Sequence, residues 1–225
     1  MRRPLVLLVV LGLFVTGCGS HGSSSSTARS TSTAPVSTSA KIATAELSQL
    51  AVKPLASMVG YSRDQFGPAW ADVDHNHCDT RNDILRRDLT QIVLEPGSTC
   101  VVERGTLHDP YTGKTIFFVR GPNSSAIQID HLVALGDAWR TGATGWSAAR
   151  REQYANDPAV LLAVDGPANE AKGDADASQW LPPNRSYDCS YVVKQIAVKM
   201  KYRLWVTQGE RGAIENVLAG CSQAS

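Results

Sequence analysis

The chain has 225 residues and a formal net charge of +1, but four of its 22 basic residues precede Glu46, which is the first of its 21 acidic residues. The remaining 180 or so residues are enough for one well-buried domain, and their 18 basic and 21 acidic residues give it a net charge near −3. A protein that binds nucleic acid tightly through bulk electrostatics is normally basic, so this charge argues against that class.

The first 18 residues predict a lipoprotein signal peptide. Arg2 and Arg3 precede the apolar run Leu5–Val15, which is too short to span a bilayer comfortably. The following Val15-Thr16-Gly17-Cys18 resembles a bacterial lipobox, in which the cysteine is lipidated and becomes the new N-terminus. We therefore expect an exported chain, either anchored to the outside of the cell membrane through Cys18 or secreted. An ordinary cleaved signal peptide with a chance cysteine is the alternative.

Residues 19–45 are rich in Ser, Thr and Ala and contain few large apolar side chains. Such a composition cannot bury enough surface to fold, so it predicts a flexible linker before a domain at 46–225. The domain opens with a helical pattern over Glu46–Met58, which Pro54 interrupts.

Four cysteines follow Cys18. An even number in an exported chain indicates two disulfides, for which three pairings are possible. Local closure favours Cys78–Cys100 and Cys189–Cys221. A zinc site is the competing interpretation, but no Cys-x-x-Cys spacing supports it.

The stretch Asp72–Asp83 imitates a calcium loop, with oxygen donors at positions 1, 3, 5 and 12. His77 stands where the sharp turn needs glycine, which weakens this interpretation. A calcium-binding envelope module remains an alternative. Directly after, Thr80–Leu89 predicts a helix capped by Asp79 or Thr80, and its Arg81 is a candidate for phosphate contact.

Two strands are expected over Thr99–Leu107 and Lys114–Arg120, around a turn sequence. We expect this hairpin to extend the sheet that holds the next strand, Ile127–Asp130. After a helix over Leu132–Arg140 and another over Ser147–Tyr154, the run Val160–Val164 predicts a further strand.

Gly166-Pro167 marks a turn into a helix that carries Asn169 and Lys172. Two further helices are expected over Tyr187–Val206 and Gln208–Leu218. Lys194, Lys199, Lys201 and Arg203 give the first of them a basic side that could follow a phosphate backbone, or a solvated face.

The strand, strand and helix from Ile127 to Lys172 present a combination with a chemical use. One carboxylate and one amide oxygen suit Mg²⁺, which keeps several waters and takes few protein ligands. The imidazole of His131 could take a proton from an attacking water. Because Asp130 and His131 are neighbours, both can serve one site only if the strand ends there.

At these residues the chain resembles the HNH (His-Me finger, ββα-metal) endonucleases, and within them the bacterial HNH endonuclease family proteins related to the C-terminal domain of GmrSD-type restriction enzymes. The resemblance extends in order from Tyr61 to Cys221. The motifs that carry it are Cys78-Asp79-Thr80-Arg81-Asn82-Asp83, Asp109-Pro110-Tyr111-Thr112-Gly113, Asp130-His131-Leu132-Val133-Ala134-Leu135, Leu161-Leu162-Ala163-Val164-Asp165-Gly166, Asn169-Glu170-Ala171-Lys172-Gly173-Asp174 and Trp180-Leu181-Pro182-Pro183-Asn184.

This resemblance implies an α+β fold with a ββα-metal core, to which the hairpin and flanking helices are added. It implies His131 as general base, Asp130 and Asn169 as ligands of Mg²⁺ or Mn²⁺, and cleavage of DNA or RNA, DNA being favoured. Lys172 and Arg81 are candidates for steadying the phosphate. The middle Asn of the HNH pattern, which braces the loop between the two strands, would fall at position 160. This chain has Val160 there, so it departs from the pattern and the bracing of the loop is affected.

The leading hypothesis is therefore a monomeric, exported, metal-dependent endonuclease. Each residue also has a structural alternative: Asp130 could cap a helix, His131 could be a core histidine, and Asn169 could form a turn. A catalytically degenerate surface lipoprotein that binds a partner is the second hypothesis.

Overall fold

The structure, a computed structural model, describes residues 36–221. Cys18, the predicted signal peptide and the first part of the predicted linker lie outside these residues. The described elements are α1 (Val36–Gln49), α2 (Thr80–Asp88), β1 (Thr90–Leu94), β2 (Val102–His108), β3 (Thr115–Val119), β4 (Ile127–His131), α3 (Leu135–Arg140), α4 (Ala148–Ala155), β5 (Leu161–Asp165), α5 (Gly166–Lys172), α6 (Asp188–Tyr202) and α7 (Gln208–Cys221). Within residues 36–221 the fold is thus α+β, as expected.

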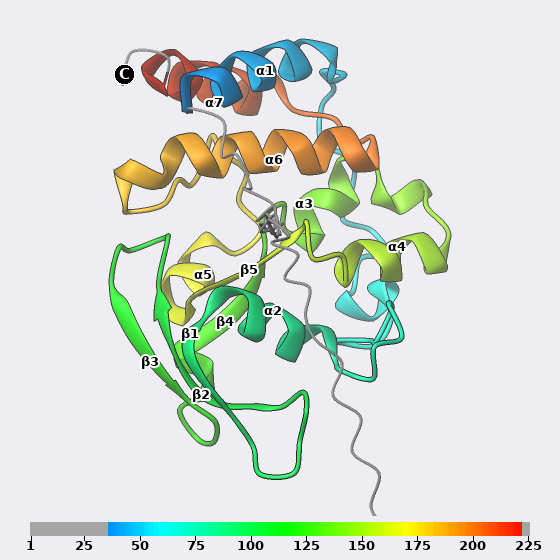
Figure 1. The fold of residues 1–225 in the computed structure, drawn as a ribbon. Helices are drawn as coiled ribbons and strands as arrows, with labels where there is room; N and C mark the ends of the chain where they lie inside the picture. The colour runs from blue at the N-terminus through cyan, green and yellow to red at the C-terminus, as the bar shows by residue number, and fades with distance from the viewer. Residues whose placement is uncertain (1–35, 222–225) are drawn as a thin grey trace, which may run out of the picture. The chain divides into compact units, whose positions relative to one another are not determined.

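Helix α1 corrects the predicted linker boundary at residue 45. It begins at Val36, and its residues Ala40, Ala43 and Leu47 are buried at helical spacing. This face packs against α6 and α7, so that α1 and α7 lie side by side along α6 (Figure 1). The small side chains permit close helix packing, which a composition argument based on large apolar residues overlooks.

The strands form two separate antiparallel sheets. One has the order β1-β2-β3 and the other pairs β4 with β5. The prediction that the hairpin extends the sheet of Ile127–Asp130 is therefore wrong. The second edge of β2 is taken by β1, a strand that the sequence patterns did not reveal and whose register is interrupted by a bulge. The two sheets instead meet through side chains, because Phe118, Ile127 and Ala163 share one buried cluster.

The ββα unit is compact because its second strand runs directly into α5. A Cβ atom at Gly166 would collide with the carbonyl oxygen of Ser125, so the tight turn needs glycine here. The Asp165 carboxylate caps the helix by accepting a hydrogen bond from the amide of Ala168 at 2.9 Å, and Pro167 occupies its first turn.

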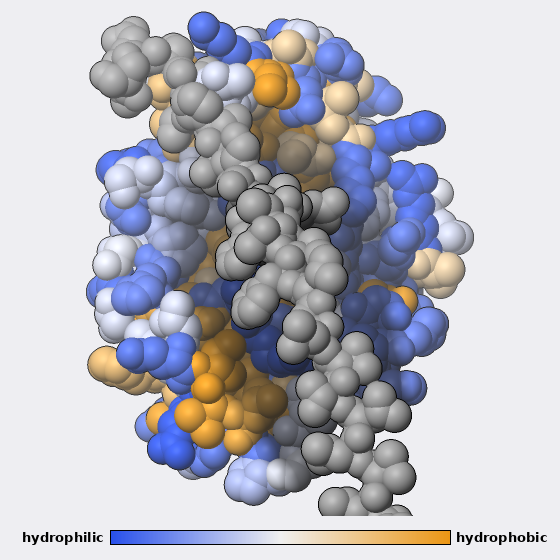
Figure 2. Space-filling model, viewed as in Figure 1, coloured by the Kyte–Doolittle hydropathy of each residue, from blue (hydrophilic) through white to orange (hydrophobic). Residues whose placement is uncertain are grey.

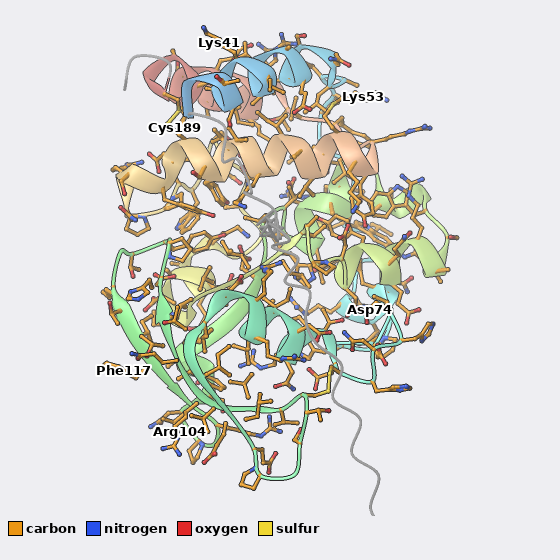
Figure 3. The ribbon with its side chains drawn as sticks, in the orientation of Figure 1. Lys41, Lys53, Asp74, Arg104, Phe117 and Cys189 are labelled. Atoms are coloured by element: carbon orange, nitrogen blue, oxygen red, sulfur yellow. A yellow bond between two sulfur atoms is a disulfide. The ribbon has the colours of Figure 1, made fainter. Side chains whose placement is uncertain are left out.

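Two disulfides have the favoured pairing. Cys78 is bonded to Cys100, with Cα atoms 5.3 Å apart, and Cys189 to Cys221, with Cα atoms 5.7 Å apart. The second joins α6 to the end of α7 (Figure 3). Among the described residues, no helix has the length and apolar character needed to cross a membrane.

Candidate functional site

The site is built on the ββα unit of β4, β5 and α5. The strands are paired from Ile127 opposite Asp165 to His131 opposite Leu161, and α5 packs against both strands. Because β5 and α5 are continuous, the helix that carries Asn169 returns over the strand that carries Asp130. The helix therefore lies on the same side of the unit as Asp130.

A cavity of about 270 Å³ opens where β4 ends, and we call it the strand-end cavity. Asp130, His131 and Asn169 all line it. Asp130 and His131 are consecutive in the chain, and both can line the cavity because β4 ends at His131. The remaining polar lining residues that bear on the chemistry are Arg63, Gln128, Glu170 and Asp174.

His131 is held in one orientation. Its Nε2 lies 3.0 Å from the carbonyl oxygen of Ala155, and a carbonyl oxygen can only accept. The proton of the neutral ring therefore sits on Nε2, which leaves the lone pair on Nδ1. Burial disfavours the charged form and lowers the pKa of His131 to about 3, so the ring is neutral at physiological pH.

Asp130 is held from two sides in the interior. One carboxylate oxygen accepts a hydrogen bond from Lys172 Nζ at 2.8 Å, and the other accepts one from the Tyr111 hydroxyl at 2.5 Å. Burial, followed by the charge of Asp130, raises the pKa of Tyr111 well above its ordinary value, so the hydroxyl keeps its proton and donates. Each carboxylate oxygen retains a second lone pair.

Lys172 has a different role from the one predicted. Its side chain is fully buried, and Nζ also donates to the carbonyl oxygen of His131 at 2.9 Å. A phosphate in solvent cannot reach this ammonium group, so the prediction of a phosphate contact is corrected. Lys172 instead ties the Asp130 carboxylate to the backbone of His131.

Asn169 lines the strand-end cavity, and its side-chain amide has a defined orientation. Its Nδ2 donates to Gln128 Oε1 at 2.8 Å, while Gln128 Nε2 donates to Glu170 Oε1 at the same distance. This chain of hydrogen bonds fixes which side of the Asn169 amide is oxygen. No hydrogen bond within residues 36–221 occupies that oxygen.

Arg81 does not lie in the strand-end cavity. Its guanidinium donates to the carbonyl oxygens of Ser124 and Ile127, at 3.3 and 3.1 Å, and so braces the start of β4. It lines a separate cavity that includes Trp70 and Arg120. The prediction that Arg81 steadies the phosphate at the site is corrected in the same way as that for Lys172.

The loop Asp72–Asp83 is closed by its own hydrogen bonds. The Asp72 carboxylate accepts from the amides of Asn76 and His77, and the Asn76 side chain donates to Asp74 and Asp83. Within the part of the chain that the structure describes, no group of three or more His, Cys, Asp or Glu side chains is arranged to hold a metal ion. The calcium hypothesis therefore gains no support.

An asparagine does occupy the loop between the two strands, four residues before Val160. Asn156 is buried, and its Nδ2 donates to the carbonyl oxygen of Glu152 at 2.9 Å. It directly follows Ala155, whose carbonyl orients His131. Val160 directly precedes β5 and is buried and apolar, and its correspondence to the middle Asn of the HNH pattern stays a prediction.

Sequence patterns also overlooked residues that the fold brings to the site. Arg63 lines the strand-end cavity from a 3₁₀ helix at Arg63–Phe66, and Tyr111 reaches Asp130 from the turn between β2 and β3. Tyr111 and Asp174 stand in the motifs of the family resemblance, which was the available signal for them. Arg63 had no such signal. Similarly, Lys199 on the predicted basic side of α6 is fully buried, so that side is not a continuous cationic surface.

Residues 79–216 match the model of the family described as "GmrSD restriction endonucleases, C-terminal domain". A protein of Arthroderma benhamiae, named an uncharacterized secreted protein, is 38% identical over 191 residues, which are 84% of this chain and 89% of that protein. No solved structure is significantly similar to this chain. The matched region includes the complete ββα unit and excludes α1.

Proposed function

Because the chain belongs to the family of the GmrSD restriction endonuclease C-terminal domain, which is nuclease-related, we propose that it is a metal-dependent endonuclease. It hydrolyses phosphodiester bonds of DNA, or of RNA, outside the cytoplasm. The strand-end cavity is its active site, and His131 is its general base.

The observation that carries this proposal is the contact between His131 Nε2 and the Ala155 carbonyl oxygen. It leaves the Nδ1 lone pair available as an acceptor on a ring that lines the strand-end cavity. A water held in the cavity can then transfer a proton to Nδ1 as its oxygen attacks phosphorus.

The donor set of the cavity fits a hard cation such as Mg²⁺ or Mn²⁺. Asn169 Oδ1 accepts no hydrogen bond from the residues that the structure describes, and Asp130 keeps a lone pair on each oxygen beyond those used by Lys172 and Tyr111. We assign these two residues as the ligands. When bound, the cation would stabilise negative charge on the phosphate and the leaving oxygen. Lys172 and Tyr111 act as positioning residues that aim the Asp130 carboxylate.

The experiment is cleavage of supercoiled plasmid and of a structured RNA by disulfide-intact protein, with Mg²⁺, with Mn²⁺ and with EDTA. We expect cleavage that EDTA abolishes and that His131→Ala slows by about 10²–10⁴-fold, the usual contribution of a general base. His108→Ala is the matched control, because His108 is exposed on β2 away from the cavity.

Cleavage by His131→Ala at the wild-type rate would refute the assignment of the base. A pure sample that is inert with Mg²⁺, Mn²⁺, Ca²⁺ and Zn²⁺ would favour the alternative of a degenerate scaffold that binds a partner.

We further propose that the chain acts as a monomer held at the outer surface of the cell membrane through lipidated Cys18, which lies outside the described residues. The two disulfides support an oxidising location. In a bacterial host, metabolic labelling with an alkynyl fatty acid should mark the wild-type chain and leave Cys18→Ser unmarked. Labelling of both, or of neither, would exclude lipidation at Cys18.

A further inference from the structure

A second cavity of about 270 Å³ adjoins the strand-end cavity, and we call it the tryptophan cavity. It lies between the segment 63–70 and the end of β4. The two cavities share Arg63, His131 and Leu135 in their walls, so His131 separates two neighbouring spaces. A cavity of this size has room for about nine waters, a number similar to the non-hydrogen atoms of one nucleobase.

The walls of the tryptophan cavity suit a flat aromatic ligand. Trp70, partly exposed, and His131 lie nearly parallel, with ring centroids 6.4 Å apart and planes at 16°. Phe66, which is buried, adds apolar surface. Trp70 has a φ of 59°, a left-handed conformation that is uncommon for a bulky residue and that the surrounding structure must hold.

Asn156 lines the tryptophan cavity and has an unused hydrogen-bond acceptor. Its side chain is 1% exposed, and its Nδ2 is bound to the Glu152 carbonyl oxygen, which identifies the other atom as oxygen. That Oδ1 is buried and has no hydrogen-bond partner within the described residues. A buried acceptor without a partner is costly, and an N–H group of a ligand would satisfy it.

Arg63 stands where the two cavities join. It is exposed, and no hydrogen bond or ion pair within residues 36–221 engages its guanidinium. A free guanidinium beside His131 can bind a phosphate through two parallel donors. The order of groups is therefore the proposed metal ligands of the strand-end cavity, then Arg63, and then the tryptophan cavity with its apolar walls and the polar side chain of Asn156.

From this order we infer that the tryptophan cavity binds the base of a nucleotide next to the scissile phosphate, so that the preferred substrate is single-stranded. The inference rests on the proposed function and specifies its substrate class. A base in a duplex is stacked and paired, and it must be extruded before it can enter such a cavity. Single-stranded nucleic acid presents free bases that stack on aromatic side chains. The net negative charge of the domain also offers little general affinity for a duplex.

The experiment uses single-stranded deoxyoligonucleotides with a mapped cleavage position, and partners in which an abasic residue replaces the nucleotide on either side of it. If one aromatic side chain stacks on the base, the abasic residue should lower kcat/KM of the wild-type protein by a factor of about 5 to 150 when it lies on one particular side of the cleavage position. Trp70→Ala should lower cleavage of the intact strand by a similar factor and make the protein indifferent to the abasic residue. Trp70→Phe should retain most of the rate.

Phe117→Ala is the matched control. Phe117 is 74% exposed and points outward from β3, where an apolar patch lies over the three-stranded sheet (Figures 2 and 3). It lines neither cavity, so its removal should change nothing. Circular dichroism melting of each variant distinguishes a folding defect from a lost contact.

The inference is overturned if the wild-type protein cuts duplex and single strands equally well, or if Trp70→Ala loses the same factor on intact and abasic strands. A wild-type protein that cuts no substrate would refute the proposed function instead. Fluorescence anisotropy with the same oligonucleotides then still tests whether the tryptophan cavity binds a base. Binding that depends on the base and that Trp70→Ala abolishes would support the inference. Binding that does not depend on the base, or no binding, would refute it.

Discussion

Two lysines are completely buried among the residues that the structure describes, and their surroundings differ. Lys172 on α5 lies below the strand-end cavity and shares the Asp130 carboxylate with the Tyr111 hydroxyl. Lys199 on α6 lies among helices and contacts Asp137 of α3 at 3.0 Å and Glu210 of α7 at 2.9 Å. The first cation therefore has one carboxylate partner, and the second has two.

This difference in charge balance indicates that Lys172 positions a carboxylate at the strand-end cavity, whereas Lys199 holds helices together. The Lys172 pair is neutral overall and presents one carboxylate to a cavity. The Lys199 group holds one surplus negative charge between α3, α6 and α7, and burial raises the pKa of Glu210 to about 7 despite the nearby ammonium. Asp137 and Glu210 are fully enclosed, so this group has no access to a substrate. We therefore expect the two lysines to differ in what their removal does to activity.

Among the variants that test this comparison, the largest effect is expected for Lys172→Met. The Asp130 carboxylate would remain buried without its cation, which should lower the free energy of unfolding by about 3–5 kcal/mol. Cleavage per folded molecule should also fall by about 10- to 100-fold, because a misaligned ligand weakens metal binding. Urea unfolding and single-turnover cleavage measure the two effects. Lys194→Met, on an exposed position of α6, should change neither. Full activity in folded Lys172→Met would remove the distinction between the two lysines.

Lys199→Met should destabilise the protein nearly as much as Lys172→Met does, but it should not affect the activity of the folded protein. The loss of the cation that pairs with Asp137 and Glu210 should again lower the free energy of unfolding by about 3–5 kcal/mol, and by less in acid, where Glu210 can protonate. The cleavage rate of the folded fraction should equal that of the wild-type protein. A loss of turnover in molecules shown to be folded would mean that α3 and α6 transmit strain to the site.

The two regions should respond to acid in opposite directions. The pKa of His131 falls from 6.5 to about 3 on folding, so the unfolded chain binds more protons between these values and stability is lost as pH falls through this range. The pKa of Glu210 rises from 4.5 to about 7, so its contribution is present below 4.5 and is lost as pH rises towards 7. Each slope is at most about 1.4 kcal/mol per pH unit.

Between pH 4.5 and 6.5 these slopes should largely cancel in the wild-type protein. Urea unfolding at several pH values should show stability rising with pH in Glu210→Gln and falling with pH in His131→Asn. Identical profiles for both variants would contradict the assignment of these groups.

The smallest effect is expected for Tyr111→Phe. The Asp130 carboxylate would lose one hydrogen bond but keep Lys172, which should cost about 1–2 kcal/mol of stability. Cleavage should decline less than in Lys172→Met, since the carboxylate keeps its main anchor. A larger decline than in Lys172→Met would show that the hydroxyl, rather than the ammonium, aims Asp130.

The local structure around the site could be predicted from the sequence, because each of its elements is formed by residues that lie close together in the chain. Alternating residues defined β4, the apolar run defined β5, and Gly166 and Pro167 marked the start of α5. The family motifs then placed Asp130, His131 and Asn169 together. The disulfide pairing was also accessible, because each bond closes a segment of modest length.

The long-range parts of the fold were not accessible in this way. The pairing of β1 with β2 depends on a bulged register, and the separation of the two sheets depends on which strand edges are already occupied. Helix α1 is stabilised by α6 and α7 rather than by its own composition. Each of these outcomes is a choice between partners that lie far apart in the chain.

The sequence alone determined the chemistry that is present: a carboxylate, an imidazole and an amide on a ββα unit, in a chain with two disulfides. Only the tertiary structure decided what each cation does. Lysine and arginine look alike as solvated charges in a sequence, but burial turned Lys172 and Lys199 into internal counter-ions and Arg81 into a brace of β4, whereas it left Arg63 free beside His131. The physical reason is that a charge takes its role from its solvation and its partners, and the folded chain sets both.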